Sequence, residues 1–301
     1  MHIPDHMLNG NTVPSITSII SSAGIVAASY FALKSKEKPD SLKFAAVTAL
    51  IFAMQMLNFP IQNGTSGHFL GTTFAILLLG APFGILSMSI ILLIQTLVFS
   101  DGGISVLGAN ILNMAFGGAI PGILLLSFIK KHENNILLKN ILIFFASFLS
   151  LLIAAFFCVL ELSFSNTIDF SLVFPAMMGV HTLIGICEGL ITIILATLLS
   201  TSTIKKSENL SFVIPFVGAI IIGLILSPFA SSFPDGLEWV AEKYNFLHNN
   251  APYFVSPFKD YTVPFIKNEI FSTSIAGLVG VIITFIFVFT IGKIFSLKKE
   301  N

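Results

Sequence analysis

Residues 139–163, KNILIFFASFLSLLIAAFFCVLELS, carry one lysine at the start and one glutamate near the end of a long apolar run. A helix needs about 20 mostly apolar residues to cross the hydrocarbon core of a bilayer, so this stretch predicts a membrane-spanning helix. The rest of the chain has the same character. Of its 301 residues, 55% are hydrophobic and 10% are charged, and the mean hydropathy is +0.93. Soluble domains carry roughly 25% charged residues, so the sequence predicts an integral membrane protein.

Similar apolar runs along the chain predict an all-α, polytopic helical bundle of about eight or nine transmembrane segments. The third segment is short and is expected to cross only partly. Its start, residues 62–68, is too polar and glycine-rich to face lipid, and irregular backbone at that depth must pack in protein or line a cavity. Pro82 separates it from the fourth segment. The predicted segments are 14–33, 42–59, 69–80, 82–99, 104–129, 139–163, 173–200, 211–230 and 272–295.

The lysines orient these segments. If the N-terminus lies outside and the C-terminus inside, twelve of the fifteen lysines fall in inner connections and three in outer ones. This distribution fits the positive-inside bias of membrane proteins, provided that the short third segment counts as a crossing. The same topology brings residues 1–2 and the loop 60–68 together on the outer side.

A boundary divides the chain into two unequal parts. Residues 201–210 form a polar linker that is expected inside the cell, after a membrane domain of residues 1–200. Residues 211–301 then follow a different plan, with two spans that flank an outer polar segment, 231–271. No internal repeat is evident.

The first nine residues, MHIPDHMLN, point to a metal. They lack the basic n-region and the cleavage site of a signal peptide. Because a histidine follows it, we expect Met1 to be retained. Its α-amine, the His2 backbone amide and the His2 imidazole can then close a five- and a six-membered ring around one ion. In-plane nitrogen donors suit Ni(II), Cu(II) and some Co(II) sites.

His68 is the candidate for a fourth nitrogen. It ends the run GTSGH (64–68), in which Gly64 and Gly67 allow the backbone to approach a ligand closely. An ionisable residue at membrane depth is a functional candidate by default. The alternative is that His2 belongs to a disordered tail and that His68 is a structurally satisfied histidine. His6 either extends the site or lies in solvent.

Five further polar residues are candidates for orienting the ligands or for coupling binding to movement. Asp101, in an outer turn, either orients a ligand imidazole and attracts a cation or only forms the turn. Asn110 and Asn113 share a helix face, where a structural role is favoured. His181 and Glu188 also share a face, and they either tune the site or form a structural pair. We expect Glu188 to be the only acid deep within a span.

Absent motifs and composition narrow the function. The chain has no Gly-x-x-x-x-Gly-Lys-Ser/Thr motif, so it does not bind ATP in that way, and it lacks His-Glu-x-x-His and Gly-x-Ser-x-Gly. Its zero net charge does not support nucleic-acid binding. Cys158 and Cys187 lie in apolar runs and are expected to be core side chains.

Taken together, several motifs make residues 1–200 resemble the metal-binding substrate subunit of energy-coupling-factor nickel and cobalt importers, the CbiM/NikM family. Residues 234–238, Pro-Asp-Gly-Leu-Glu, resemble the signature of the companion NikN-like subunit, so the whole chain looks like a NikMN-type fusion. The motifs of the first part are MHIPD (1–5), NFPI (58–61), GTSGH (64–68), DGG (101–103), GANILNM (108–114) and the stretch 181–189.

The resemblance implies a metal site made of the Met1 amine, the His2 amide and imidazole, and the His68 imidazole. It also implies an ATP-driven importer in a prokaryotic plasma membrane. Its partners would be a membrane coupling subunit (CbiQ/NikQ-like) and cytoplasmic ATPases (CbiO/NikO-like), and no organic cofactor is expected. The family usually has glycine at the position of His6, which leaves the ligand set slightly open. Nickel and cobalt are not separated, although the general affinity order favours Ni(II).

Two other classes of function remain open at this stage. A stand-alone secondary permease is typically built from inverted repeats with discontinuous helices in both halves, and no repeat is evident here. An intramembrane enzyme could use His181 and Glu188 as acid and base, but no nucleophile or substrate pocket is identifiable from the sequence.

Overall fold

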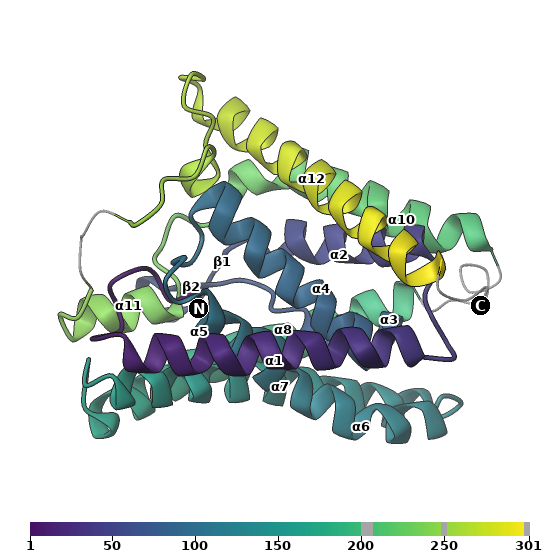
Figure 1. Ribbon diagram of the computed structural model, residues 1–301, viewed down its shortest axis with the longest axis horizontal. Helices are drawn as coiled ribbons and strands as arrows, with labels where there is room; N and C mark the ends of the chain where they lie inside the picture. Colours follow the sequence, from purple (N-terminus) through teal and green to yellow (C-terminus); the bar gives the residue numbers. More distant parts are fainter. Residues whose placement is uncertain (200–206, 248–251, 298–301) are drawn as a thin grey trace.

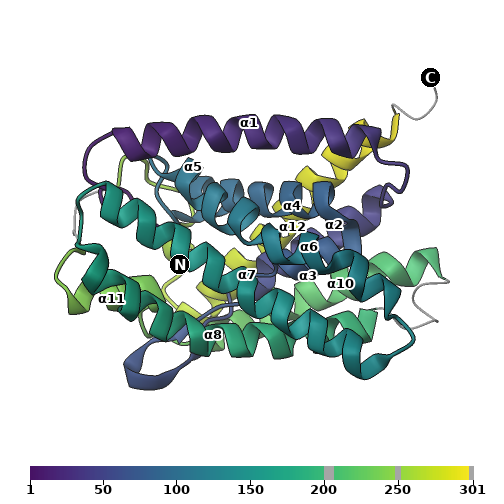
Figure 2. The ribbon, with the colours of Figure 1, turned by 90° about the horizontal axis from the view of Figure 1, so that it is seen from below.

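The computed structural model describes residues 1–199, 207–247 and 252–297. The described part contains seven helices that are long and apolar enough to cross a membrane. Figures 1 and 2 show these helices running between the two ends of the molecule. They are α1 (Thr12–Lys34); α4 (Ala81–Ile94) with its π-helical extension η2 (Gln95–Phe99); α5 (Leu107–Asn110), η3 (Ile111–Gly117) and α6 (Ala119–Lys131); α7 (Ile136–Phe164); α8 (Phe170–Leu199); α10 (Glu208–Ile221), η4 (Ile222–Leu226) and η5 (Ser227–Phe229); and α12 (Glu269–Leu297).

Two shorter helices complete the bundle. The helix α2 (Ser41–Gln55) starts at Asp40, whose side chain accepts a hydrogen bond from the Leu42 amide, and it is buried along most of its length. An all-round apolar helix of this kind belongs inside a bundle. The helix ends at Gln55, four residues before the end of the predicted segment 42–59, because the chain turns there toward a two-stranded hairpin.

The third predicted segment is a helix only in part. The helix α3 (Thr72–Leu79) has eight residues and lies between Gly71 and Gly80, whose φ angles of +82° and +83° favour glycine. The residues before it, 66–71, are not helical. A short hairpin of β1 (Phe59–Pro60) and β2 (Ser66–Gly67) precedes it. As expected, irregular backbone here is buried in protein.

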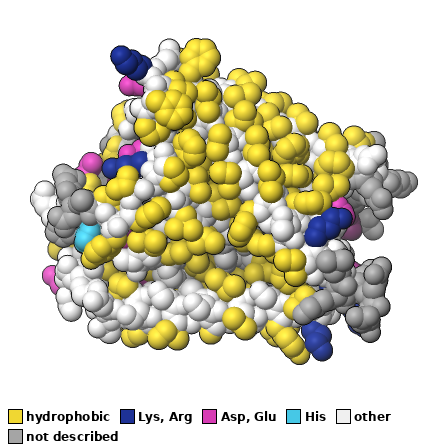
Figure 3. Space-filling model, turned by 45° about the horizontal axis from the view of Figure 1, so that its top comes forward, with side chains coloured by type: hydrophobic (Ala, Val, Ile, Leu, Met, Phe, Trp, Pro, Cys, Tyr) yellow, Lys and Arg dark blue, Asp and Glu magenta, His cyan; other side chains and the backbone are white. Residues whose placement is uncertain are grey.

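The N-terminal segment and the C-terminal end of the chain lie at opposite ends of the bundle. Figure 1 shows the N-terminus, the hairpin and α11 (Gly236–Lys243) toward one end, and the C-terminal end of α12 at the other. The predicted meeting of residues 1–2 with the loop 60–68 is therefore confirmed. Figure 3 shows a broad apolar surface with the charged side chains toward its edges, as a membrane-spanning protein requires. The outward placement of the N-terminus stays a prediction.

The last two long helices are built into the same bundle. The helices α10 and α12 pack on α2 and lie together in Figure 1. The turn η4, which continues α10, approaches α12 so closely at Gly223 that a side-chain carbon there would lie 3.0 Å from the Gly277 carbonyl oxygen. The segment between them folds back over the Met1 end. Of the predicted linker 201–210, residues 201–206 lie outside the described part of the chain.

Candidate metal centre

The N-terminal residues are buried and held in place. Met1, His2 and Ile3 are 4%, 7% and 0% exposed. The Ile3 amide donates to Asn110 Oδ1 at 2.8 Å, and Asn110 Nδ2 donates to the Ile3 carbonyl at 3.0 Å. The Gly103 amide donates to the same carbonyl at 2.9 Å. The alternative of a disordered N-terminal tail is therefore wrong, and Asn110 is the residue that fixes the start of the chain.

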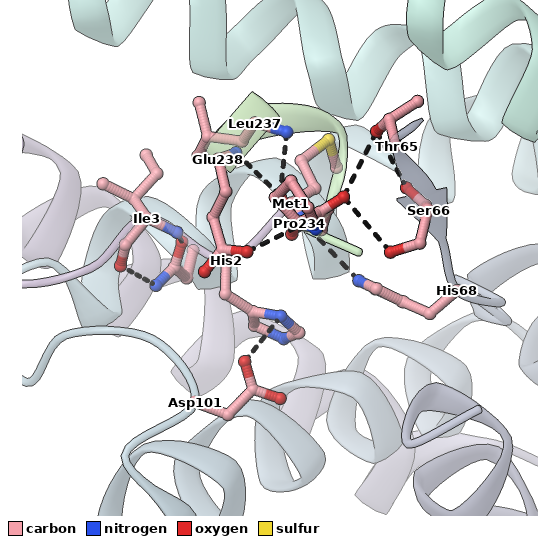
Figure 4. A network of polar contacts seen from close by, with 12 residues as sticks. Met1, His2, Ile3, Thr65, Ser66, His68, Asp101, Pro234, Leu237 and Glu238 are labelled. Carbon is pink, nitrogen blue, oxygen red and sulfur yellow. Dashed lines mark hydrogen bonds and ion pairs between the residues drawn. The ribbon is translucent and has the colours of Figure 1, made fainter. Parts of the chain in front are cut away.

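The α-amine meets the imidazole of His68. Met1 N lies 3.3 Å from His68 Nε2 (Figure 4). His68 Nδ1 donates to the Phe69 carbonyl at 3.1 Å, so Nε2 is the nitrogen whose lone pair faces the amine. Burial, followed by the nearby ammonium of Met1, lowers the pKa of His68 to about 3. The ring is therefore neutral at any ordinary pH and suited to bind a metal.

His2 lies beside His68 between two acceptors. The two imidazoles stack, with ring centroids 5.3 Å apart and planes 23° from parallel. His2 Nδ1 lies 3.0 Å from Asp101 Oδ1, and Nε2 lies 3.1 Å from Gln95 Oε1. Burial lowers the pKa of His2, and the Asp101 carboxylate partly offsets this effect. Asp101, a predicted candidate, therefore contacts the predicted ligand His2. Gln95 contacts the same imidazole, and the sequence did not indicate it.

A carboxylate from the second part of the chain binds the amine. Asp235 forms an ion pair and a hydrogen bond with Met1 N. Burial alone would raise the pKa of Asp235, but the ammonium and the hydrogen bonds it receives hold that pKa well below its usual range. Asp235 is also the N-cap of α11, where it forms a capping box with Glu238. The spacing Asp-x-x-Glu in residues 235–238 was the sequence signal for this cap.

The remaining predicted residues have other partners. Asn113 donates to Glu161 Oε2 at 2.7 Å. Glu161 is a second acid buried in a span, so the expectation that Glu188 is the only one is wrong. His181 donates to the Met177 carbonyl at 2.8 Å. Glu188 accepts from the two amides that precede α3. His181 and Glu188 thus share a helix face, yet each has its own partners.

The candidate donors include backbone nitrogens as well as side chains. Within the described residues, no group of three or more His, Cys, Asp or Glu side chains is placed to hold a metal ion. Among those residues, no acceptor pairs with the His2 backbone amide, whereas the next amide is bonded to Asn110. His6 contacts Tyr253, with ring centroids 4.2 Å apart. The nitrogen donors that converge therefore belong to Met1, His2 and His68.

The fold and this buried cluster define a polytopic helical membrane protein with nitrogen donors gathered at one end. Residues 2–205 match the CbiM family, described as a cobalt uptake substrate-specific transmembrane region, and residues 210–297 match the PDGLE domain. The chain belongs to the CbiM family and carries a PDGLE domain in its second part.

Several known proteins are similar to this chain. A protein of Archaeoglobus fulgidus assigned as a fused nickel transport protein, NikMN, is 33% identical over 292 residues, which cover 94% of this chain and 95% of the relative. The cobalt transport protein CbiM of Clostridium cellulovorans is 27% identical and covers 58% of this chain and 69% of its own. The crystal structure of a transition metal transporter, at 27% identity, matches with a TM-score of 0.58 over 70% of this chain and 96% of that one.

Proposed function

We propose that this chain captures Ni(II) or Co(II) as the substrate-binding component of an uptake system. The ion is bound by the Met1 amine, the His2 amide and imidazole, and His68 Nε2. One observation carries the proposal. The α-amine of a buried N-terminus lies 3.3 Å from a neutral, buried imidazole nitrogen. The membership of the chain in the CbiM family, and the nickel and cobalt transport named for its relatives, support the same cargo.

The spacing of the donors suits a planar site. Metal–nitrogen bonds of about 2.0–2.1 Å place two ligands at right angles roughly 2.9 Å apart. The separation between Met1 N and His68 Nε2 is a few tenths of an ångström larger than this. The amine and the His2 amide would close a five-membered ring, and that amide with Nδ1 of the same residue would close a six-membered one. His68 then takes the fourth position, between the amine and the His2 ring.

Loading requires changes at three of the four donors. The amine has to leave its ion pair with Asp235 and lose a proton, because a protonated nitrogen has no lone pair for the ion. The His2 amide also has to release its proton to solvent before its nitrogen can bind the ion. His2 Nδ1, which faces Asp101, has to turn to the ion. Asp101 and Asp235 remain beside the ligands and offset the positive charge of the cation. His68 needs no change, since its Nε2 already faces the amine.

Transport needs partners in this proposal. A membrane coupling subunit and cytoplasmic ATPases would drive release into the cell, because the chain carries no P-loop motif of its own. The end of the bundle that holds the site would face the outside of a prokaryotic plasma membrane. The excess of lysines near the opposite end of the bundle supports this orientation. Of the two metals, the general affinity order favours Ni(II).

The test is the metal content and affinity of the purified chain offered Ni(II) and Co(II). We expect one tightly bound ion per chain, lost in His68→Ala and in a variant with one extra residue before Met1. The control is His132→Ala, which removes an imidazole that lies at the end of α6, away from the Met1 end. Binding that survives both the extension and His68→Ala would refute the four-nitrogen site. ATP-independent transport by the chain alone would refute the partner requirement.

A further inference from the structure

The second part of the chain contacts both of the segments that carry the proposed ligands. Asp235 binds the Met1 amine. The carbonyl of the preceding residue, Pro234, accepts from the Ser66 amide at 2.8 Å and from Ser66 Oγ at 3.2 Å. Ser66 lies two residues before His68 in the same loop. Two consecutive residues of the PDGLE motif therefore tie the amine to the loop of its neighbouring ligand (Figure 4).

The turn that makes these contacts is itself fixed. Asp235 Oδ1 accepts from the amides of Leu237 and Glu238 at 2.8 and 2.9 Å, and Glu238 Oε2 accepts from the Asp235 amide at 3.1 Å. Gly236 lies against His181, where a side-chain carbon would stand 2.9 Å from Cε1 of the ring. Leu237 is fully buried in a cluster that also contains the N-terminal segment. The carboxylate is therefore held in one position.

A second contact from the same outer segment reaches the other ligand. The Tyr261 hydroxyl donates to Asp101 Oδ2 at 2.7 Å, and Asp101 Oδ1 faces the His2 imidazole. Two carboxylates thus contact the proposed ligands. Asp235 belongs to the segment 231–271 itself, and Asp101 accepts a hydrogen bond from Tyr261 of that segment. Carboxylates in this position orient metal ligands and tune their affinity.

Given the proposed function, on which this inference rests, we propose that Asp235 is a positioning residue of the metal site and that the PDGLE turn holds the amine and the His68 loop at ligand spacing. A metal-bound amine still carries two N–H bonds, so one can donate to Asp235 after loading. The carboxylate then stabilises the bound dication from beyond its ligands. The PDGLE domain contributes to metal binding in this way without supplying a ligand.

Asp235→Asn tests this role, because asparagine caps a helix as well as aspartate does. It removes the charge and places an NH2 group where the oxygen that accepts from the amine stands. The control is Glu242→Gln, which removes an exposed carboxyl from the same helix, α11. Glu242 lies near the end of that helix, outside the residues 234–238 that contact the two ligand segments.

We expect Asp235→Asn to bind Ni(II) about 10–100-fold more weakly than the unchanged chain at the same pH, and Glu242→Gln to stay within about threefold of it. The ligand-field absorption bands of the Ni(II)-saturated Asp235→Asn variant should match those of the unchanged chain. Equal affinity of the two variants would overturn the positioning role, and shifted bands would mean that Asp235 is itself a ligand. Binding by the unchanged chain that survives the N-terminal extension would instead refute the proposed function.

Discussion

Glu188 holds the backbone that follows His68, and its replacement by glutamine should loosen the metal site. Its two oxygens accept from the Leu70 amide at 2.7 Å and the Gly71 amide at 2.9 Å. The carboxylate is 1% exposed. Glutamine keeps one acceptor oxygen and brings an NH2 group toward the other amide. One buried N–H is then left facing a donor, and the remaining hydrogen bond loses its charge.

The magnitude follows from these two bonds. A hydrogen bond to a charged group contributes about 1.5–3 kcal/mol, and an unsatisfied buried donor costs about 1–3 kcal/mol. Glutamine is cheaper to bury than a carboxylate, which offsets part of the loss. We therefore expect Glu188→Gln to lower the free energy of unfolding by about 2–4 kcal/mol. At about 2–4 °C per kcal/mol for domains of this size, the thermal midpoint should fall by roughly 5–15 °C.

The assay is thermal unfolding of the purified chain in detergent, with Ni(II) affinity measured on the same samples. The control is Thr192→Val, one turn along α8, because the Thr192 hydroxyl bonds only to the Glu188 backbone carbonyl at 2.8 Å. We expect this variant to lose no more than about 1 kcal/mol. Glu188→Gln should also bind metal more weakly, since His68 lies directly before the freed backbone. Equal midpoints for the two variants would refute this reasoning.

Three further results are expected. Metal affinity should fall as the pH is lowered, because the Met1 amine and the His2 amide bind the ion only without a competing proton, whereas the pKa of His68 is about 3 and its ring stays neutral. A Kd for Ni(II) that does not change with pH would contradict this. Gly236→Ala should lower the thermal midpoint through contact with His181, at a cost of about 1–3 kcal/mol, and His181→Ala should relieve part of that loss in the double variant. Asn110→Ala should weaken Ni(II) binding and lower the thermal midpoint only slightly, because it frees the N-terminal segment from its contact with Asn110.

Much of the fold could be predicted because membrane insertion leaves a strong one-dimensional signal. The run 139–163 appears as α7, Ile136–Phe164, and the short third segment appears as α3. The predicted spans also indicated which loops meet, because two crossings separate residues 1–2 from the loop 60–68 and return the chain to the same side. The exact helix ends were harder. Turns such as the one at Gln55 depend on local backbone contacts rather than on hydropathy.

The candidate ligands could be predicted because chelate geometry is local for residues 1–2. Their surroundings could not. Asp235 reaches the amine across 234 residues of sequence, and nothing in the hydropathy pattern indicates that contact. Glu161 stands near the end of a predicted span, where an acid normally faces water. Its partner Asn113 lies in the π-helix η3, and π-helical turns occur often at functional sites.

The arrangement of the donors indicates where such a site is weakest. Three of the four proposed nitrogens belong to Met1 and His2 and move together as one segment. His68 lies on a separate loop, and the two segments are joined at Asp235 and Pro234. Metal–ligand distances tolerate deviations of only about 0.2 Å. A shift of the PDGLE turn by a fraction of an ångström would therefore break the bond to His68 first. Release of the ion needs no unfolding of the bundle, only a movement that separates these two segments.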